Sequence, residues 1–418
     1  MKLKDIFTLY TKSVTPTSDK KYHLYSLPAF DNNKKREEVD GAEILSNKFS
    51  VPDKCILFNK LNVRFKRVWL IDNKDENKLA STEFFPLIVN EGKVDFWFAY
   101  YLLTSDFVTN FLSEQHSNTS QSHKRIDSDL LFSIDVELPS MKEQKAIGKF
   151  LNNLDSKIAL NREINRNLEA MARQLYDYWF VQFDFPNEEG KPYKSSGGEM
   201  VWHEKLKRKI PKGWSVSNIF DELSIQYGFP FSTELFTEEE TNIPVVRIRD
   251  ILENSVSAYS NEPVEEKYRL DKGDLIIGMD GNFHMNYWTD NVSFLNQRSV
   301  RLRAKKNSTV SIMQTKFDIA PYIRAKELRA KGSTVGHLSD KDLKELYVLV
   351  CPNTNVRKKF DSILSLIIEN RCEVVNLTKQ RDELLPLLMN GQVNCDLSVL
   401  VCCYLRICVN YIEKYHKS

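Results

Sequence analysis

The sequence predicts an α+β protein in which a mixed domain followed by a long helix occurs twice along the chain. Three observations support this prediction. Short strand-like runs alternate with turn residues and helical stretches in residues 1–138, and again in residues 214–350. A heptad pattern of apolar residues follows each stretch. Similar short motifs recur about 213 residues apart, which indicates an internal repeat.

The first domain, residues 1–138, contains three strand-like runs at Cys55–Phe58, Val68–Ile71 and Phe85–Val89. One aromatic stretch, Phe96–Leu112, has a helical pattern. Turn residues separate these runs, so we expect strands and helix to pack as one α+β domain.

Residues 139–183 predict the first long helix, because apolar residues follow a four-three alternation over more than four heptads. These residues are Ile147, Leu151, Leu154, Ile158, Leu168, Ala172, Leu175 and Trp179. A helix of about 40 residues spans roughly 60 Å. Asn161 and Asn165 interrupt the apolar seam. We interpret them as register-fixing polar residues; the alternative is an exposed face of a helix that does not pair.

The second half of the chain repeats this order. Residues 184–213, rich in Pro, Gly, Ser and charge, predict a linker before the second domain at 214–350. Residues 351–393 predict a second long helix that Pro386 and Gly391 end. Its apolar seam consists of Phe360, Ile363, Ile367, Val374, Leu377, Leu384 and Leu388, with Asn370 and Arg381 at the two remaining positions. Asn370 is the third candidate register residue. Residues 394–418 form a C-terminal tail whose apolar side chains we expect to bury against a neighbour.

Composition excludes several classes of protein. Hydrophobic residues make up 42% and charged residues 28%, as in ordinary globular chains rather than disordered or membrane ones. The net charge of +2 means that any affinity for nucleic acid must come from local clusters. The seven cysteines show neither a disulfide framework nor zinc-ligand spacing, and no signal peptide or membrane span is evident. We therefore expect a cytoplasmic protein that does not contact a membrane.

Motifs for catalysis and cofactor binding are missing from the sequence. There is no dinucleotide-binding glycine motif, P-loop, Asn-Pro-Pro-aromatic methylation motif, serine-nucleophile elbow or zinc-protease helix. The histidines lack ligand spacing, so we predict no catalytic residue and no metal site. One alternative is an autonomous Mg²⁺-dependent nuclease that uses Asp53, Glu76 and Lys78, although these residues are also ordinary surface charges. Another is a coiled-coil scaffold that binds only proteins.

An ordered set of motifs resembles the DNA-specificity subunits of type I restriction–modification enzymes. In the first half these are residues 25–30, 46–49, 143–145, 154–158, 168–175 and 179–184. In the second half they are residues 210–214, 273–281, 295–298, 332–338 and 380–388. The similarity covers nearly all of residues 20–393, whereas the tail from Asn394 diverges from the family.

The resemblance implies two target-recognition domains separated by two long helices that pack antiparallel as a coiled coil. Each domain would read one half of a bipartite site in double-stranded DNA. Adenine methylation and ATP-driven cleavage would belong to separate modification and restriction subunits, in a system for phage defence. S-adenosylmethionine, ATP and Mg²⁺ are therefore expected only on those partners, and no cofactor on this chain.

Two basic clusters are candidate DNA contacts, since each lies in a run without an acidic residue. The first contains Lys60, Arg64, Lys66 and Arg67, and the second contains Arg298, Arg301 and Arg303. The alternative is a solvated strand edge whose charge prevents aggregation. The recurrence of the cluster and the family resemblance favour DNA contact.

Polar loops supply the remaining candidates, because amide, hydroxyl and imidazole side chains can bond to base edges or phosphates. They are Ser120, Gln121, His123, Lys124 and Arg125 in the first half, and Asp280, Asn282, His284, Gln297, Ser333, Thr334 and His337 in the second. The alternatives are ordinary polar loops and, for residues 279–284, a hairpin turn.

Overall fold

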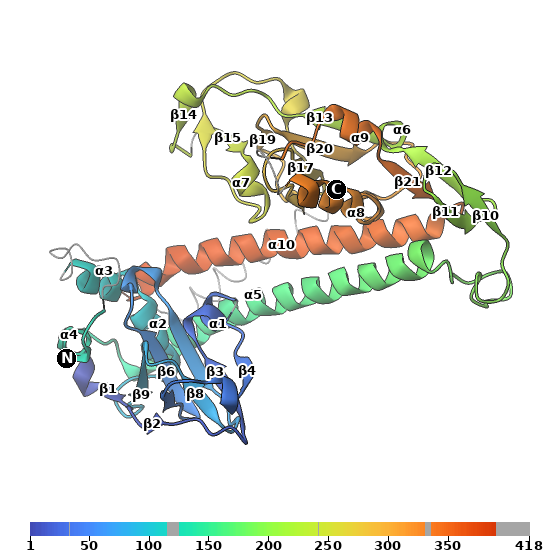
Figure 1. Ribbon diagram of the computed structural model, residues 1–418. Helices are drawn as coiled ribbons and strands as arrows, with labels where there is room; N and C mark the ends of the chain where they lie inside the picture. Colours follow the sequence, from blue (N-terminus) through green and yellow to red (C-terminus); the bar gives the residue numbers. More distant parts are fainter. Residues whose placement is uncertain (33, 115–124, 241, 331–335, 390–418) are drawn as a thin grey trace. The chain divides into compact units, whose positions relative to one another are not determined.

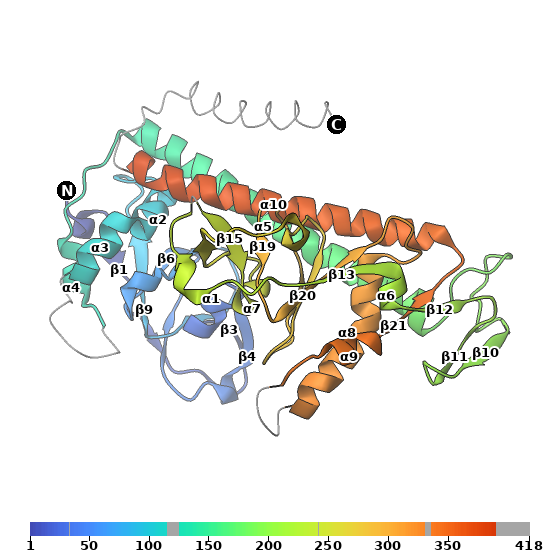
Figure 2. The ribbon, with the colours of Figure 1, turned by 90° about the horizontal axis from the view of Figure 1, so that it is seen from above.

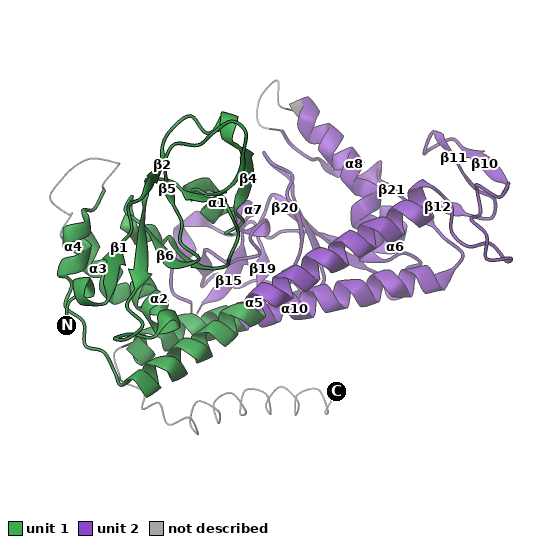
Figure 3. Cartoon of the chain, turned by 90° about the horizontal axis from the view of Figure 1, so that it is seen from below, with its two compact units in different colours: residues 1–157, 377–418 green, residues 158–376 purple. Residues whose placement is uncertain are grey.

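The computed structural model describes residues 1–32, 34–114, 125–240, 242–330 and 336–389. The chain divides into two compact units (Figure 3): unit 1 comprises residues 1–157 and the chain from residue 377 onward, and unit 2 comprises residues 158–376. Both predicted long helices are confirmed as α5 (Met141–Tyr176) and α10 (Thr354–Met389), each with 36 residues. Each helix is about 54 Å long at the usual helical rise.

Unit 1 contains two sheets (Figure 1). An antiparallel sheet has the order β1-β9-β6-β7, and a five-stranded sheet has the order β2-β5-β8-β3-β4 with β3 and β8 parallel. The strands are β1 (Phe7–Leu9), β2 (Ser13–Val14), β3 (Lys21–Tyr25), β4 (Glu37–Asp40), β5 (Lys48–Ser50), β6 (Lys54–Asn59), β7 (Val68–Asp72), β8 (Lys78–Ala80) and β9 (Phe84–Val89). The helices are α1 (Leu27–Asp31), α2 (Phe96–Thr104), α3 (Asp106–Glu114) and α4 (Ser128–Ser133), with short 3₁₀ turns η1 (Leu3–Asp5), η2 (Gly41–Glu43) and η3 (Val63–Phe65).

The aromatic stretch predicted as one helix forms two, α2 and α3. Ser105 lies between them in an extended conformation. Its hydroxyl donates to the carbonyl of Leu102 and accepts from the backbone N–H of Val108, so it ends one helix and caps the next. Both helices pack on the four-stranded sheet in the core of unit 1.

Unit 2 repeats the main sheet of unit 1, with the strand order β13-β20-β17-β18. A second sheet has the order β14-β16-β15-β19, and β10-β11 and β12-β21 form separate pairs. The strands are β10 (Met200–His203), β11 (Arg208–Pro211), β12 (Ser215–Asn218), β13 (Leu223–Tyr227), β14 (Phe236–Thr237), β15 (Ile243–Val246), β16 (Tyr259–Ser260), β17 (Leu275–Gly278), β18 (Met285–Tyr287), β19 (Phe294–Leu295), β20 (Ser299–Ala304) and β21 (Tyr347–Val350). The helices are α6 (Ile219–Glu222), α7 (Ile248–Ile251), α8 (Ile312–Ala330) and α9 (Asp340–Lys344); the shorter turns are η4 (Asp177–Val181), η5 (Thr233–Leu235) and η6 (Glu266–Tyr268).

The two strand orders confirm the internal repeat. The strands β1, β9, β6 and β7 of unit 1 correspond in order and direction to β13, β20, β17 and β18 of unit 2. The parallel pair β3–β8 corresponds to β15–β19. In each unit a short helix, α4 or α9, precedes the long helix. The repeated sequence motifs therefore mark repeated structure.

Residues 184–213, predicted as a linker, are ordered in the structure. Strands β10 and β11 form an antiparallel hairpin, and the flanking aromatic residues Phe183 and Trp214 join the core of unit 2. Phe185 stacks on Trp214 with ring centroids 5.2 Å apart. The abundance of Gly and Pro reflects the tight turns of this packed segment rather than flexibility.

The helices α5 and α10 lie side by side and run antiparallel (Figures 1 and 2). In unit 2, the amide of Asn370 donates to Asn165 Oδ1 at 3.0 Å, and the amide of Asn165 donates to the carbonyl of Ile367 at 3.2 Å. One turn earlier on α5, Asn161 donates to Glu373 Oε2 at 2.6 Å. The numbers rise along α5 as they fall along α10, which confirms the antiparallel pairing.

In unit 1 the same two helices pair through a charged group. The guanidinium of Arg381 donates to Asp155 Oδ1 at 2.8 Å, and the hydroxyl of Tyr101 donates to Asp155 Oδ2 at 2.7 Å. This contact joins both long helices to α2. The helix α10 continues through Pro386 and ends at Met389, where Leu388 and its neighbours pack into the core of unit 1.

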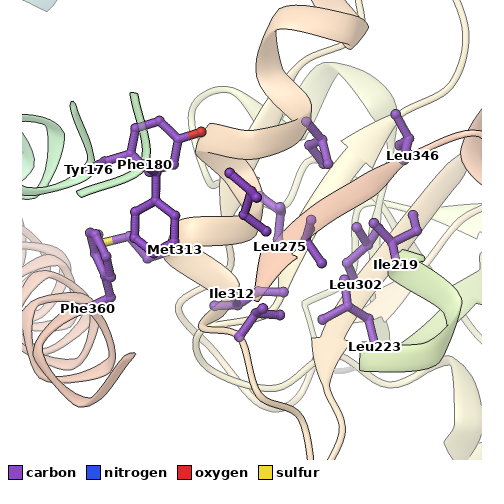
Figure 4. Close-up of a cluster of buried hydrophobic side chains, with 14 of the residues drawn as sticks. Tyr176, Phe180, Ile219, Leu223, Leu275, Leu302, Ile312, Met313, Leu346 and Phe360 are labelled. Carbon is purple, nitrogen blue, oxygen red and sulfur yellow. The ribbon is translucent and has the colours of Figure 1, made fainter. Parts of the chain in front are cut away.

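The core of unit 2 is built on the ends of the long helices (Figure 4). Tyr176 and Phe180 stack with centroids 5.4 Å apart and meet Phe360 of α10 and Met313 of α8. The hydroxyl of Tyr176 also donates to the half-buried Asp318 at 2.7 Å. Burial raises the pKa of Asp318 to about 6, despite the hydrogen bonds that favour its charged form. The helices are therefore part of the domain core and not an appendage.

Replacing the buried Phe360 with Ala is expected to destabilise unit 2 by about 3–5 kcal/mol through lost packing and a residual cavity. Leu366 lies on the same helix with 48% of its surface exposed, so Leu366→Ala is the matched control, with a change within about 0.5 kcal/mol. Urea unfolding followed by tryptophan fluorescence compares the two. Equal effects would contradict the assignment of the core.

Candidate nucleic-acid interface

A compact turn between β6 and β7, residues 60–67, carries the first predicted basic cluster. We call it the first tip. Asn62 and Lys66 have positive φ angles of 51° and 44° on either side of η3, so the turn is tightly folded. The backbone N–H of Lys60 donates to the carbonyl of Glu83 at 3.0 Å, and the carbonyl of Lys60 accepts from Ile126 at 2.9 Å. The first tip therefore lies beside Arg125 and the β8–β9 turn.

Acidic residues from other elements neutralise part of the first tip. Arg67 makes two hydrogen bonds to Asp31, at 2.7 and 2.8 Å, and Lys66 contacts Asp106 at 2.6 Å. Arg64 is exposed and has no acidic partner among the contacts of the described residues. The ammonium of Lys60 lies 5.5 Å from the ring centroid of Phe85. The sequence around these residues contains no acid, but acids from other elements pair with Lys66 and Arg67 in the folded chain. Arg64 and Lys60 are therefore the cations that remain available to an anion.

Phe65, which is not among the contacts predicted from the sequence, is 57% exposed in the first tip. The guanidinium groups of Arg64 and Arg67 lie 5.7 and 5.0 Å from its ring centroid. An exposed ring among cations suits contact with a base as well as with phosphates. One feature of the sequence could have indicated Phe65 as a contact: it is an aromatic residue flanked by cations in residues 64–67.

The second tip, residues 279–284 between β17 and β18, occupies the same place in unit 2. The N–H of Met279 donates to the carbonyl of Arg298 at 2.8 Å, and its carbonyl accepts from Leu338 at 2.7 Å. These two bonds match those of Lys60 in the first tip. The single bridges Leu61–Arg125 and Asp280–His337 match as well. Gly281 has a φ of +69°, as a tight turn requires.

Asp280, Arg298 and His337, which come from three separate segments, meet at the second tip. Arg298 Nη1 donates to Asp280 Oδ2 at 2.6 Å, and His337 Nδ1 lies 2.5 Å from Asp280 Oδ1. Burial alone would raise the pKa of Asp280, but the hydrogen bonds with His337 and Arg298 outweigh it and lower that pKa. The Asp280 side chain is only 15% exposed, against 68% for Arg298 and 59% for His337. A charged carboxylate therefore anchors two exposed nitrogen-bearing side chains.

Arg301 and Arg303, two of the predicted DNA contacts, serve the interior of unit 2 instead. Arg301 is buried in β20, and its Nη1 donates to the carbonyls of Lys267 and Arg269 at 3.2 and 3.0 Å. Burial lowers the pKa of Arg301. Arg303 makes two 2.6 Å hydrogen bonds to the buried Asp274. The alternation of side chains along β20 puts Arg301 and Arg303 on one face, opposite Val300 and Leu302, and the sequence does not show that other elements cover this face as well. We leave both arginines out of the proposed interface.

The other predicted contacts divide into three groups. Gln297 is exposed beside Arg298, Asn282 is exposed in the second tip, and His284 is half-buried. Arg125 is exposed and bonds to Glu83 through Nε and Nη2. Ser120, Gln121, His123, Lys124, Ser333 and Thr334 lie outside the described residues, as does the tail from residue 394.

The residues of the nuclease alternative do not form a metal site in the described part of the chain. Lys78 is buried and donates to Asp53 Oδ1 at 2.7 Å, whereas Glu76 is exposed. No group of three or more His, Cys, Asp or Glu residues with the geometry for a metal ion occurs among the described residues. The described helices also include none that is long and apolar enough to span a membrane.

The fold and the tips define a class of protein with two equivalent α+β domains and a pair of antiparallel helices. The first tip carries cations of its own, and the second tip lies beside the exposed Arg298. The profile of the type I restriction modification DNA specificity domain matches residues 1–170 and 211–380. These two matches cover more than half of the chain, and it belongs to this family.

Individual relatives agree with the family. The chain is 24% identical over 332 residues to the type I restriction enzyme MjaIX specificity subunit of Methanocaldococcus jannaschii, covering 76% of this chain and 74% of that one. It is 27% identical over 183 residues to the EcoBI specificity subunit of Escherichia coli, covering 42% of this chain and only 36% of that relative. The crystal structure of a type I restriction–modification S subunit from M. genitalium shares the fold, with a TM-score of 0.55 at 16% identity over 93% of this chain and 95% of that one.

The chain is thus a specificity subunit of a type I restriction–modification system, the component that recognises the DNA target. In this family the specificity subunit is not catalytic. The two matches of the family profile fall on the two halves of the chain that the strand orders relate.

Replacing Lys60 and Arg64 together with Ala is expected to flatten the slope of log affinity against log salt by about two units, if each meets one phosphate. The thermal midpoint should stay unchanged, because neither side chain serves the core. Arg301→Ala is the contrasting variant: it leaves two backbone carbonyls without their donor and should lower the thermal midpoint with no direct effect on the slope. An unchanged slope in the double variant would mean that the first tip is only solvated surface.

Proposed function

We propose that each domain reads one half of a bipartite site in double-stranded DNA and thereby directs partner subunits that methylate adenine or cleave the DNA. The observation that carries this proposal is the repeated tip. Lys60 and Met279 make the same pair of backbone hydrogen bonds to their neighbours, so each domain offers a turn at the same place in its sheet. Two equivalent turns with different side chains suit two different half-sites.

The side chains of the tips supply both kinds of contact that DNA recognition needs. Arg64 and Lys60 are cations that can neutralise phosphates and set the position of the first domain. Gln297 and Asn282 are exposed amides, which can pair with base edges in the major groove. Phe65 offers an apolar face for a base or a thymine methyl group.

The outer face of α5 is the proposed docking site for a modification subunit. Leu160, Ile164 and Met171 are 58%, 38% and 47% exposed and share one face of the helix at i, i+4 and i+11 spacing. This face differs from the seam in which Asn161 and Asn165 meet α10. An apolar stripe on a helix that already pairs with α10 suits one further amphipathic helix from a partner.

The partner subunits would supply the chemistry. S-adenosylmethionine would bind to the modification subunits, and ATP and Mg²⁺ to the restriction subunits that join the assembled complex. The family, whose specificity subunits are not catalytic, supports this division of labour. A complex that acts on genomic DNA would work in the cytoplasm.

The purified chain, incubated with DNA, Mg²⁺, ATP and S-adenosylmethionine, is expected to leave the DNA unchanged. Addition of its modification subunit should produce methyladenine at a single bipartite sequence, detected by sequencing of modified bases. Cleavage by the chain alone that Asp53→Ala abolishes would contradict the proposal and favour the nuclease alternative.

Substitution of Leu160, Ile164 and Met171 by Ser should abolish co-purification with the modification subunit, because the docking helix would lose its apolar surface. The thermal midpoint of the isolated chain should remain near that of the wild type. Val292→Ser and Leu328→Ser, both 58% exposed in unit 2 and outside the sequence of the two long helices, are the matched controls. Retained assembly in the triple variant, or equal loss in the controls, would rule out this docking face.

A further inference from the structure

We propose that Arg298 reads a guanine in the half-site of the second domain, and that Asp280 is the positioning residue that holds Arg298 for this contact. The inference rests on the proposed function, since it requires the second domain to bind DNA. It goes further by assigning one base pair of the unknown target to one side chain.

One nitrogen of the Arg298 guanidinium is held by a carboxylate, and its other two nitrogens are available to a ligand. Its Nη1 donates to Asp280 Oδ2 at 2.6 Å, whereas its Nε and Nη2 have no partner among the contacts of the described residues. The side chain is 68% exposed and stands on the turn between β19 and β20, where Arg298 has a positive φ of 63°. Guanine presents two acceptors, O6 and N7, in the major groove, and arginine binds them with two parallel N–H groups. The free Nε–Nη2 edge has this geometry.

Asp280 is well placed to hold the arginine. The carboxylate is largely buried, and its second oxygen contacts His337 Nδ1 at 2.5 Å. The strand bridge between Asp280 and His337 fixes the backbone on both sides of this contact. A long, exposed arginine otherwise samples many rotamers, so a fixed carboxylate at one corner reduces the entropy lost when the guanidinium meets a base.

The arginines at the equivalent place in unit 1 lack this combination. Arg67 donates both Nε and Nη2 to Asp31, and Arg125 donates the same two groups to Glu83. Arg64 is exposed but has no carboxylate to hold it in the described part of the chain. Glu83 occupies the place in unit 1 that Arg298 occupies in unit 2, because the carbonyl of each accepts the first N–H of its tip. The guanine is therefore assigned to the second half-site.

The test is the target sequence of the reconstituted methyltransferase, selected from a random DNA pool and confirmed by competition binding. The wild type should show one invariant G·C pair in one half-site. Arg298→Ala should reduce discrimination between guanine and the other bases at that position by about tenfold to a hundredfold, while the other positions keep their preferred bases. Arg298→Lys keeps the charge but lacks the fork, and should lose discrimination with little change in the salt slope. Asp280→Asn should weaken discrimination at the same position less than Arg298→Ala does.

Lys306→Ala is the matched control, since Lys306 is an exposed cation of the same domain. It should leave every letter of the site unchanged. If Arg298→Ala lowers affinity uniformly and every position of the site keeps its preferred base, Arg298 contacts a phosphate. That result would overturn the inference but not the proposed function. A wild-type complex that selects no bipartite sequence would overturn both.

Discussion

A polar contact inside an apolar helix seam is the constraint on which the rest of the structure depends. Asn165 and Asn370 bond to each other across α5 and α10, and Asn165 also bonds to the carbonyl of Ile367. Sliding either helix would leave the buried amide of Asn165 and the half-buried amide of Asn370 without these partners, at a cost of about 1–3 kcal/mol for a fully buried unsatisfied group. The apolar neighbours stabilise the helix pair, and we expect the amides to select one register. The cores of both units include residues of these helices, so the register also fixes how each domain packs.

The same strand order then produces two different surfaces. The backbone hydrogen bonds that define each tip are equivalent, because they depend on the sheet and hardly on side chains. The side chains diverge: Glu83 stands where the second domain has Arg298, and Arg125 stands where it has His337. A constant scaffold with variable tips is the arrangement that lets one fold recognise different sequences.

The sequence predicted the long helices and the repeat because heptad spacing and duplicated motifs are local patterns. It also placed Asn161, Asn165 and Asn370 in the seam. It failed where the outcome depends on distant residues: acids from α1 and α3 reach the first basic cluster, and Arg301 faces inward on β20. The cluster of Asp280, Arg298 and His337 joins three segments, so no spacing along the chain reveals it. The contacts among these three side chains are set by the folded sheet and cannot be inferred from their separation along the sequence.

Site-specific photo-crosslinking can determine whether the two tips contact separate halves of one DNA site. Two forms of the chain, with a photoreactive amino acid in place of Arg64 or of Gln297, are assembled with the modification subunit on the selected target. The cross-linked nucleotides are then mapped on both strands. If each domain reads one half-site, position 64 should cross-link to only one half-site and position 297 to only the other, with an uncontacted gap between them. Cross-links from both positions to the same half-site would contradict it.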